Sequence, residues 1–269
     1  MQIVVSLFRG CSTGVTLEAA STDSLLNIAG TLNLNLEMKS ASLKNKTAIV
    51  TGASRGIGLA IAKALAREGV RLGLLSRSKP AIGGEFVACD LADLDQIPEA
   101  VRQLVDRLGT VDFLINNAGV FLEKPVPEIQ LADWERSLRV NVTAPFLITR
   151  EILPQMIARK QGRIVNIAST SSSQGYLHQS AYCASKHALL GFARSLAIEA
   201  KPHGVHVYNL CPGGVDTDFI KGTYLGERLK GQPMINPDDI AEMVVFILRQ
   251  PENIDLPEII VRRFDPKAK

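Results

Sequence analysis

The chain has 269 residues, of which 46% are hydrophobic and only 5% aromatic, and its formal net charge is +3. This length allows a large core, and a composition rich in Ala, Val, Ile and Leu is typical of buried parallel strands covered by helices. The small net charge argues against a nucleic-acid partner, and no apolar run approaches the ~20 residues that cross a membrane, so a small-molecule partner and no membrane are expected.

The first 43 residues differ in pattern from the rest of the chain. The apolar run at residues 3–8 is too short, and lacks a preceding basic region, for a secretory signal, and the acidic residues Glu18, Asp23 and Glu37 argue against a mitochondrial transit peptide. Because Met38 precedes an ordinary domain start, we interpret residues 1–43 as an N-terminal extension, either disordered or produced by an upstream start. A targeting or docking role is the alternative. Residues 44–269 are predicted to form one dinucleotide-binding catalytic domain.

The cysteines are widely separated along the chain. They are Cys11, Cys89, Cys183 and Cys211, with no CxxC pair and no histidines at the spacing of zinc ligands. We interpret them as reduced thiols of a cytoplasmic protein, and we expect no metal site.

From Lys46 onward, short β-branched runs alternate with amphipathic stretches of helical period. Seven strands are predicted, at residues 47–51, 71–76, 85–89, 111–116, 163–169, 205–210 and 258–263. This alternation predicts an α/β fold of the Rossmann type, a doubly wound parallel sheet with helices on both faces, in a single domain. Residues 77–84 leave no room for a crossover helix, so a turn is expected there. Ligands bind such sheets outside the carboxyl ends of the strands.

The sequence TGASRGIG (51–58) follows the first predicted strand and opens a helix. Gly52 allows a tight turn, Gly56 lets the backbone approach a pyrophosphate, and Gly58 lets helix and strand pack closely. Any strand-to-helix turn tolerates glycines, but this position after the first strand favours nucleotide binding.

The end of the second predicted strand indicates the cofactor. An acidic residue there would bind the ribose 2′-hydroxyl of NAD, but the chain has Ser76 and Arg77, and Arg55 lies in the glycine loop. Two guanidinium groups suit a 2′-phosphate, so NADP is predicted in preference to NAD. The alternative is that either arginine is simply solvated.

Further motifs follow in order along the chain. They are NNAG at 116–119, Asn141 in VNVT, Ser169 after IVNIA, the YxxxK pair Tyr182 and Lys186, and PG at 212–213 with Thr217. With the glycine pattern of Thr51, Gly52, Gly56 and Gly58, these motifs resemble the short-chain dehydrogenase/reductase family over residues 44–261, and in particular its 3-oxoacyl-[acyl-carrier-protein] reductase-like members.

Tyr182 and Lys186 are four residues apart on a predicted helix, so their side chains project from one face. The reference pKa of tyrosine is ~10, and a nearby ammonium together with an oxidised nicotinamide favours the phenolate. Lowering the tyrosine pKa to ~7 needs about 4 kcal/mol, which requires a close and partly desolvated charge.

The resemblance implies hydride transfer between a nicotinamide and a carbonyl carbon. It implies that Tyr182 acts as the general acid or base and that Ser169 donates a hydrogen bond to the carbonyl oxygen. It also implies that Lys186 holds the nicotinamide ribose and tunes the tyrosine, and that Asn141 positions a water. Taken alone, Tyr182 is typical of a core tyrosine and Ser169 of a cap after a strand, and Asn141 has the alternative of a buried structural amide.

The same resemblance implies a set of cofactor contacts. Asp90 has a second interpretation, as a helix cap. The set is Gly52, Ser54, Arg55, Gly56, Ile57, Gly58, Arg77, Asp90, Leu91, Asn117, Ala118, Gly119, Tyr182, Lys186, Pro212, Gly213, Val215 and Thr217.

Other features concern the substrate and the partners. Residues 217–235 resemble the family's mobile substrate lid, an ordinary surface excursion being the alternative. Lys160 and His203 occupy places where carrier-protein reductases have basic groups at the site rim, which makes acyl carrier protein a candidate partner. His178 is interpreted either as facing substrate or as a solvated or core histidine. A homodimer or homotetramer is expected, although the C-terminus lacks the Gly-Gly pair with which many members pack subunits.

The sequence therefore predicts an NADP-dependent oxidoreductase that reduces a ketone or a 3-oxoacyl group. One alternative is an alcohol or 3-hydroxy acid dehydrogenase working in the oxidative direction. The other is a non-catalytic dinucleotide-binding sensor, against which the complete set of Asn141, Ser169, Tyr182 and Lys186 argues.

Overall fold

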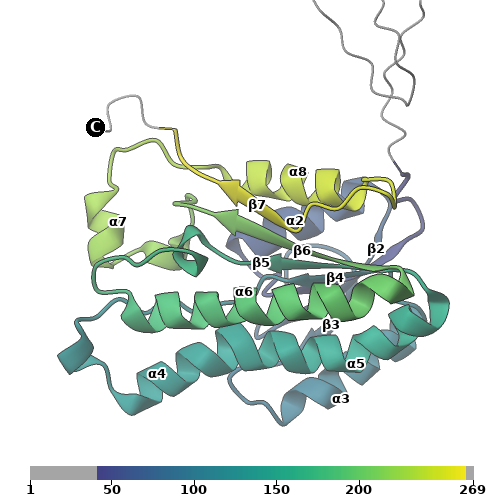
Figure 1. Cartoon of the computed structure of the whole chain (residues 1–269), viewed down its shortest axis with the longest axis horizontal. Helices are drawn as coiled ribbons and strands as arrows, with labels where there is room; N and C mark the ends of the chain where they lie inside the picture. The colour runs from purple at the N-terminus through teal and green to yellow at the C-terminus, as the bar shows by residue number, and fades with distance from the viewer. Residues whose placement is uncertain (1–40, 265–269) are drawn as a thin grey trace, which may run out of the picture. The chain divides into compact units, whose positions relative to one another are not determined.

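A single parallel sheet carries all seven predicted strands (Figure 1). The computed structural model describes residues 41–264, so the predicted extension lies outside the described residues except for 41–43. The strand order is β3-β2-β1-β4-β5-β6-β7. Successive strands are added on one side of β1 as far as β3 and on its other side from β4 onward, so the order of the connections reverses beside β1. The strands are β1 Thr47–Thr51, β2 Arg71–Ser76, β3 Glu85–Ala88, β4 Phe113–Asn116, β5 Gly162–Ile167, β6 Val205–Pro212 and β7 Glu258–Val261.

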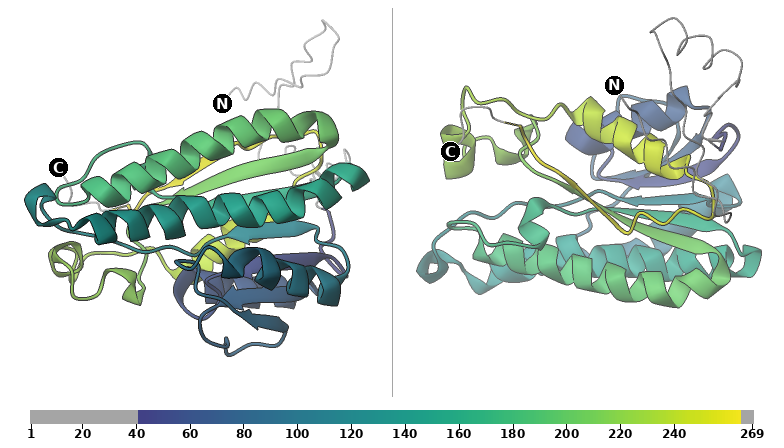
Figure 2. Two further views of the ribbon diagram at one scale, coloured as in Figure 1. Left: turned by 90° about the horizontal axis from the view of Figure 1, so that it is seen from below. Right: turned by 45° about the horizontal axis from the view of Figure 1, so that its top comes forward.

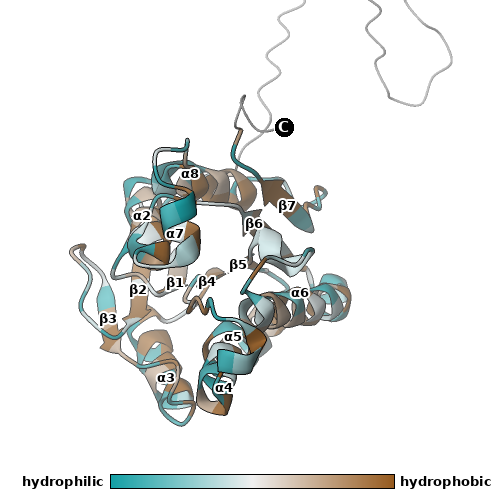
Figure 3. Ribbon diagram, turned by 90° about the vertical axis from the view of Figure 1, so that its left-hand side faces the viewer, coloured by the Kyte–Doolittle hydropathy of each residue, from teal (hydrophilic) through white to brown (hydrophobic). Residues whose placement is uncertain are grey.

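Helices cover both faces of the sheet, as Figure 3 shows from the carboxyl edge. One face packs against α2 (Gly56–Arg67) and α8 (Pro237–Leu248), and the other against α3 (Gln96–Leu108), α5 (Ala144–Arg159) and α6 (Ser180–Ala200). Figure 2 shows α5 and α6 lying side by side along the sheet. No helix separates β2 from β3, as predicted from the short connection. The shorter elements are η1 Val126–Glu128, α4 Leu131–Leu138, η2 Arg139–Thr143, η3 Thr170–Ser172, η4 Lys201–His203, η5 Asp218–Ile220 and α7 Tyr224–Arg228.

Successive residues of a strand face opposite sides of the sheet and so belong to two different hydrophobic clusters. Val50 and Ile115 face the cluster under α2 and α8, whereas Ile49 and Leu114 face the cluster under α3, α5 and α6, and all four are fully buried. A sheet that is buried on both faces needs apolar residues at successive positions, which explains the continuous aliphatic runs in the sequence.

Several strand ends differ from the prediction by one or two residues. β5 ends at Ile167, because Ser169 is the N-cap of η3 and turns the chain away from the sheet. β7 ends at Val261, so Arg262 and Arg263 lie in the segment that follows the strand. Both differences place polar side chains beyond the carboxyl ends of strands, where the site is expected.

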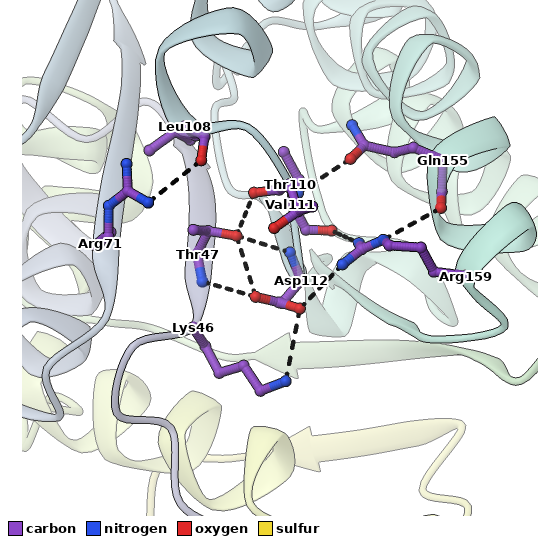
Figure 4. A network of polar contacts seen from close by, with 9 residues as sticks. All are labelled: Lys46, Thr47, Arg71, Leu108, Thr110, Val111, Asp112, Gln155 and Arg159. Atoms are coloured by element: carbon purple, nitrogen blue, oxygen red, sulfur yellow. Dashed lines mark hydrogen bonds and ion pairs between the residues drawn. The ribbon is translucent and has the colours of Figure 1, made fainter.

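Asp112 fastens the opposite, amino edge of the sheet (Figure 4). Its Oδ2 accepts a hydrogen bond from the backbone N–H of Thr47 at 2.9 Å, and its Oδ1 lies 3.3 Å from Arg159 Nη1 and 3.7 Å from Lys46 Nζ. One carboxylate thus joins the start of β1 to the approach to β4 and to the end of α5.

Buried asparagines cross the sheet on β4, β5 and β6. Asn116 Nδ2 donates to Asn166 Oδ1 at 3.0 Å, Asn166 Nδ2 donates to Asn209 Oδ1 at 3.2 Å, and Asn209 Nδ2 donates to the Pro257 carbonyl at 3.1 Å. Burying these amides is tolerated because each donates a hydrogen bond to the next group. The ladder links the three strands from which the predicted catalytic loops emerge.

Candidate active site

A cavity of about 860 Å³ opens at the carboxyl edge of the sheet. The loops that follow β1 to β6, the segment after β7 and the predicted lid line it. Every predicted cofactor contact lines this cavity, as do Ser169, Tyr182 and Lys186. Asn141 alone among the predicted site residues does not, because it is completely buried behind the wall.

Tyr182 and Lys186 project from the same side of α6. The lysine Nζ lies 5.9 Å from the centroid of the tyrosine ring and donates a hydrogen bond to the carbonyl of Ile167 at 3.0 Å. Only 6% of Tyr182 and 3% of Lys186 are exposed. The end of β5 therefore fixes the ammonium beside the phenol in a nearly dry environment.

Burial shifts the two proton affinities in opposite directions. It raises the pKa of Tyr182 to about 12, although a hydrogen bond with Ser169 acts to lower it, and it lowers the pKa of Lys186 to about 8. Burial therefore opposes the lowered tyrosine pKa that the sequence suggested for the ammonium together with an oxidised nicotinamide, because it disfavours the phenolate. Without cofactor Tyr182 is a neutral phenol, the form that donates a proton.

Ser169 is oriented by a reciprocal pair of hydrogen bonds. Its Oγ accepts from the backbone N–H of Ser171 at 3.1 Å, and its own backbone N–H donates to Ser172 Oγ at 3.2 Å. A hydroxyl that accepts a hydrogen bond in this way still has its proton to donate. Its side chain is half-buried at the cavity wall.

Asn141 lies in the π-helical turn η2, between α4 and α5. Its Oδ1 accepts from the Val120 N–H at 2.8 Å, and its Nδ2 donates to the Val120 carbonyl at 3.0 Å and to Ser185 Oγ at 2.9 Å. The amide thus fixes the backbone that follows the NNAG motif. A Cβ on Gly119 would lie 3.3 Å from Asn141 Oδ1 and 3.8 Å from Lys186 Nζ, so both atoms border the same small space.

The glycine turn at residues 52–58 has the geometry of an anion site. Gly52 and Gly56 have φ angles of +66° and +55°, which favour glycine, and a Cβ on Gly58 would overlap the Gly52 carbonyl and the Asn117 side chain. The helix α2 begins without a side-chain cap and without an acidic residue in its first turn. Its first N–H groups are therefore available to anionic oxygens, and the turn fits a pyrophosphate.

The predicted ribose and adenine contacts lie beside this turn. Arg55 and Arg77 are both exposed, both line the cavity, and neither forms an ion pair with another described residue. Asp90 Oδ1 accepts from the Ala92 N–H at 3.1 Å, whereas α3 begins only at Gln96. Asp90 thus stabilises a turn and does not cap a helix.

Two phenylalanines border Tyr182 on the side of the predicted lid. The ring of Phe121 meets the tyrosine ring edge-on, with centroids 4.9 Å apart, and Phe219 of the lid lies 5.9 Å from Phe121 and 6.3 Å from Tyr182. Leu225 of the lid also lines the cavity, whereas Tyr224 and Met234 do not. The space beside the phenol is therefore apolar.

Side-chain contacts from three other segments hold the segment 217–235 over the cavity. Glu123 Oε2 accepts from the Leu225 N–H at 2.9 Å, and Arg263 Nη1 donates to Gln232 Oε1 at 2.9 Å. The ring of His178 packs edge-on against that of Tyr224, with centroids 6.1 Å apart. His178 does not line the cavity, so it contacts the lid and not the substrate space.

The expectation that Lys160 and His203 lie at the rim of the site is wrong. Lys160 follows the end of α5 and precedes β5, and His203 lies in η4 before β6. Both are therefore at the amino edge of the sheet, opposite the cavity. The reason is that each crossover helix must return the chain to the amino end of the next parallel strand.

Sequence analysis missed several residues that line the cavity. Phe121 could have been found, since it follows the NNAG motif by only two positions, and Arg262 and Arg263 were assigned to the last strand. Gln174 lies in the Ser-rich loop that follows Ser169, and Gly214 lies between the predicted contacts Gly213 and Val215, whereas the others belong to no motif. Among these residues are Phe121, Arg136, Gln174, Tyr176, Gln179, Gly214, Arg228, Arg262, Arg263 and Phe264.

Two further features concern residues 41–264, namely possible metal ligands and cysteines. Residues 41–264 contain no group of three or more His, Cys, Asp or Glu side chains that could hold a metal ion. Cys89, Cys183 and Cys211 are buried free thiols. In the same part of the chain, no helix combines the length and the apolar character that a membrane span requires.

Comparisons with known proteins agree with this geometry. A family model described as short chain dehydrogenase matches residues 46–227. An uncharacterised oxidoreductase from Staphylococcus epidermidis is 31% identical over 231 residues, which cover 82% of this chain and 99% of the relative. A protein from Streptomyces violaceoruber, named as a ketoacyl reductase of the granaticin polyketide synthase, is 42% identical over 184 residues, 63% of this chain and 68% of the relative. A metagenomic short-chain oxidoreductase solved in complex with NADP is 34% identical, with a TM-score of 0.71 over 83% of this chain and 99% of the other.

Proposed function

Because the chain belongs to the short-chain dehydrogenase family of NAD(P)-dependent oxidoreductases, we propose that it is an NADP-dependent reductase of a ketone or a 3-oxoacyl group. The observation that carries this proposal is the neutral, buried Tyr182, with Ser169 and Lys186 beside it, at the wall of the cavity. At this position Tyr182 can donate its proton to a carbonyl oxygen in reduction, and its phenolate can accept the proton of an alcohol in oxidation.

The residues around the glycine turn fit NADP. The N-terminus of α2 would hold the pyrophosphate, and the free guanidinium groups of Arg55 and Arg77 would hold a 2′-phosphate. The metagenomic relative, which was solved with NADP, supports the same assignment. When bound, the cofactor supplies the hydride; the protein supplies the proton and the positioning.

The side chains of this protein would act on the carbonyl oxygen of the substrate. Ser169 donates its free hydroxyl proton to that oxygen, which stabilises the negative charge as it develops. Tyr182 transfers its proton to the same oxygen, and the ammonium of Lys186 then stabilises the phenolate. Asn141 holds the backbone of Val120, which lines the cavity, through two hydrogen bonds. The small space beside Gly119 would hold the water through which Lys186 regains protons.

The apolar surface of Phe121 and Phe219 suits a substrate with hydrocarbon next to its carbonyl. The Streptomyces relative named as a ketoacyl reductase supports a 3-oxoacyl group. Acyl carrier protein, a homo-oligomeric state and a cytoplasmic location stay predictions. Lys160 and His203 do not support the first, because they lie at the amino edge of the sheet.

The test follows the oxidation of NADPH by absorbance with a panel of ketones and 3-oxoacyl thioesters. We expect reduction by the wild type, and a loss of about 10²- to 10⁴-fold in kcat for Tyr182→Phe with NADPH binding retained. The matched control is Tyr208→Phe, which removes a buried hydroxyl with no partner among the described residues and leaves the cavity intact. NADPH binding without reduction would favour the sensor, and turnover only of alcohols with NADP⁺ would favour the oxidative alternative.

A further inference from the structure

The cavity is lined by many more cationic than anionic side chains. Its carboxylates are Asp90 and Asp218, and Asp218 is paired with Lys221 outside the cavity. Its arginines are Arg55, Arg77, Arg136, Arg228, Arg262 and Arg263, and none forms an ion pair with another described residue. The arginines that do pair within residues 41–264 all lie outside the cavity: Arg67, Arg102, Arg107, Arg150, Arg159, Arg194 and Arg249.

Five of these six arginines come from two distant parts of the fold, and the sixth, Arg136, lies in α4. Arg55 and Arg77 follow β1 and β2, whereas Arg228 lies in the lid and Arg262 and Arg263 follow β7. Five strand spacings separate β2 from β7 in the sheet order, or about 24 Å at ~4.8 Å per strand. The 2′-phosphate proposed for Arg55 and Arg77 therefore leaves the second group without a partner.

Arg263 is already oriented for a ligand. Its Nη1 donates to Gln232 Oε1 at 2.9 Å and to the Pro233 carbonyl at 3.2 Å, and its side chain is half-buried. A Cβ on Gly214 would lie 3.3 Å from Arg263 Nε, so the guanidinium rests against the backbone just beyond β6. Its Nε and Nη2 have no hydrogen-bond partner among the described residues, and this edge of a guanidinium is the one that binds a carboxylate or a phosphate through two hydrogen bonds.

We propose that the substrate carries an anionic group, a carboxylate or a phosphate, that binds the free edge of Arg263, with Arg228 and Arg262 adding positive charge. This inference rests on the proposed function, since it defines the substrate of the same site. The anion sits at the lid end of the cavity, and the carbonyl lies between Tyr182 and the two phenylalanines. Because Arg263 also holds Gln232 and Pro233, the anion is bound where the C-terminal segment meets the lid.

The experiment uses two matched pairs of substrates with the full-length enzyme and NADPH. 4-Oxopentanoate against its methyl ester tests a carboxylate, and acetoacetyl-CoA against acetoacetyl-N-acetylcysteamine tests a phosphate. The variants are Arg263→Gln and Arg263→Lys, and the matched control is Lys230→Gln, an exposed cation of the lid that does not line the cavity. The wild type should prefer the charged member of one pair, and that pair identifies the anion.

Arg263→Gln should lower kcat/KM for the charged member about 10- to 100-fold, mainly through KM, as expected for losing hydrogen bonds to a charged group. For the neutral member KM should rise only by the few-fold that the lost Gln232 and Pro233 contacts explain, Arg263→Lys should recover part of the loss for the charged member, and Lys230→Gln should match the wild type. The dissociation constant of NADPH, measured by fluorescence, should be the same for all variants. A weaker NADPH complex for Arg263→Gln would assign the arginine to the cofactor and overturn the proposal.

Failure of the proposed function gives a different result. If the wild type reduces both members of each pair equally well, the enzyme is a reductase without an anion site. If it reduces none of the four, calorimetric titration of 4-oxopentanoate and of CoA into the NADPH complex still tests whether the anion site exists. Binding that Arg263→Gln weakens at least 10-fold supports the anion site, and the absence of such a difference overturns it.

Discussion

Tyr182 and Lys186 share one buried site, and burial acts against the charged form of each. The tyrosine pKa rises to about 12 and the lysine pKa falls to about 8, so at neutral pH the pair is a phenol beside an ammonium. Since the lysine alone leaves the tyrosine protonated, a phenolate near neutral pH needs a second positive charge. The nicotinamide of the oxidised cofactor has such a charge, whereas that of the reduced form does not.

This balance predicts how Tyr182 titrates. In the protein without cofactor, its phenolate should appear only as the pH rises above about 10, because its pKa lies above the reference value. Addition of NADP⁺ should move that transition to lower pH, and NADPH should move it less. The measurement is the ultraviolet difference spectrum of wild type minus Tyr182→Phe across pH, which removes the signals of the other tyrosines. A phenolate near pH 7 in the cofactor-free protein would contradict this interpretation.

Arg77 is expected to determine the preference for NADPH over NADH. Replacing Arg77 with Asp removes a cation from the proposed 2′-phosphate site and adds a repelling charge, so kcat/KM for NADPH should fall by about 10- to 100-fold or more. The value for NADH should not fall. The matched control is Lys79→Asp, which reverses an exposed charge two residues away that does not line the cavity. An unchanged ratio of the two cofactors in Arg77→Asp would mean that the guanidinium is only solvated.

Residues in motifs were predictable because regular elements place them. The four-residue spacing of Tyr182 and Lys186 fixes a shared helix face, and strand ends fix the positions of Gly52 and Ser169. Arg263 was not predictable, since its place in the cavity depends on where β7 ends and on the path of the chain beyond it. Asn141 was found from its motif, but only the structure shows that its amide is occupied by Val120 and Ser185.

At the scale of elements, the loop after β4 connects the lid to the loop that precedes Tyr182. Glu123 accepts a hydrogen bond from the Leu225 N–H at the start of α7, and the adjacent Lys124 N–H donates to the His178 carbonyl at 2.8 Å. A movement of α7 that breaks the first contact leaves the second in place. Glu123 is therefore the contact to remove in order to test whether the segment 217–235 acts as a lid.

Glu123→Ala should loosen the lid and leave the catalytic groups unchanged. Loss of this charge-assisted hydrogen bond should raise KM for the carbonyl substrate several-fold, because closure then costs more of the binding free energy, while kcat changes little. Trypsin should also cleave sooner after Lys221, Arg228 or Lys230. Glu128→Ala, an exposed carboxylate of the same loop with no side-chain hydrogen bond among the described residues, is the control. Equal rates of cleavage for the two variants would show that Glu123 does not hold the lid.

The number of strands and their parallel arrangement were predictable, whereas the ends of several strands were not, and the directions of the crossover helices were not taken into account. Runs of five to seven mostly apolar residues identified all seven strands, and the continuous aliphatic runs of the central strands reflect their burial on both faces. The wrong placement of Lys160 and His203 was avoidable. The predicted parallel sheet already requires that each helix end near the amino edge, so residues that precede β5 and β6 cannot border a site at the carboxyl edge.

At the scale of the whole molecule, the two edges of the sheet have separate tasks. The carboxyl edge carries the cavity, with unpaired arginines and the glycine turn on its wall, as the binding of a ligand requires. The amino edge is fastened by Asp112, which is 8% exposed and bonded to groups from β1 and α5 (Figure 4). β1 spans five residues, or about 16 Å, between these edges. Stability and binding should therefore respond to different substitutions.

Asp112→Ala tests this separation. The variant leaves the Thr47 N–H and the Arg159 guanidinium without their shared partner, so the free energy of unfolding should fall by about 2 kcal/mol or more, measured by urea denaturation. Values of kcat and KM, measured well below the unfolding transition, should match the wild type, since no cavity residue contacts Asp112. Asp106→Ala, which removes an exposed carboxylate with no ion pair in residues 41–264, should change neither stability nor kinetics. A fall in kcat with normal stability would instead mean that the amino edge sets the geometry of the site through β1 and β4, and the two edges would not be independent.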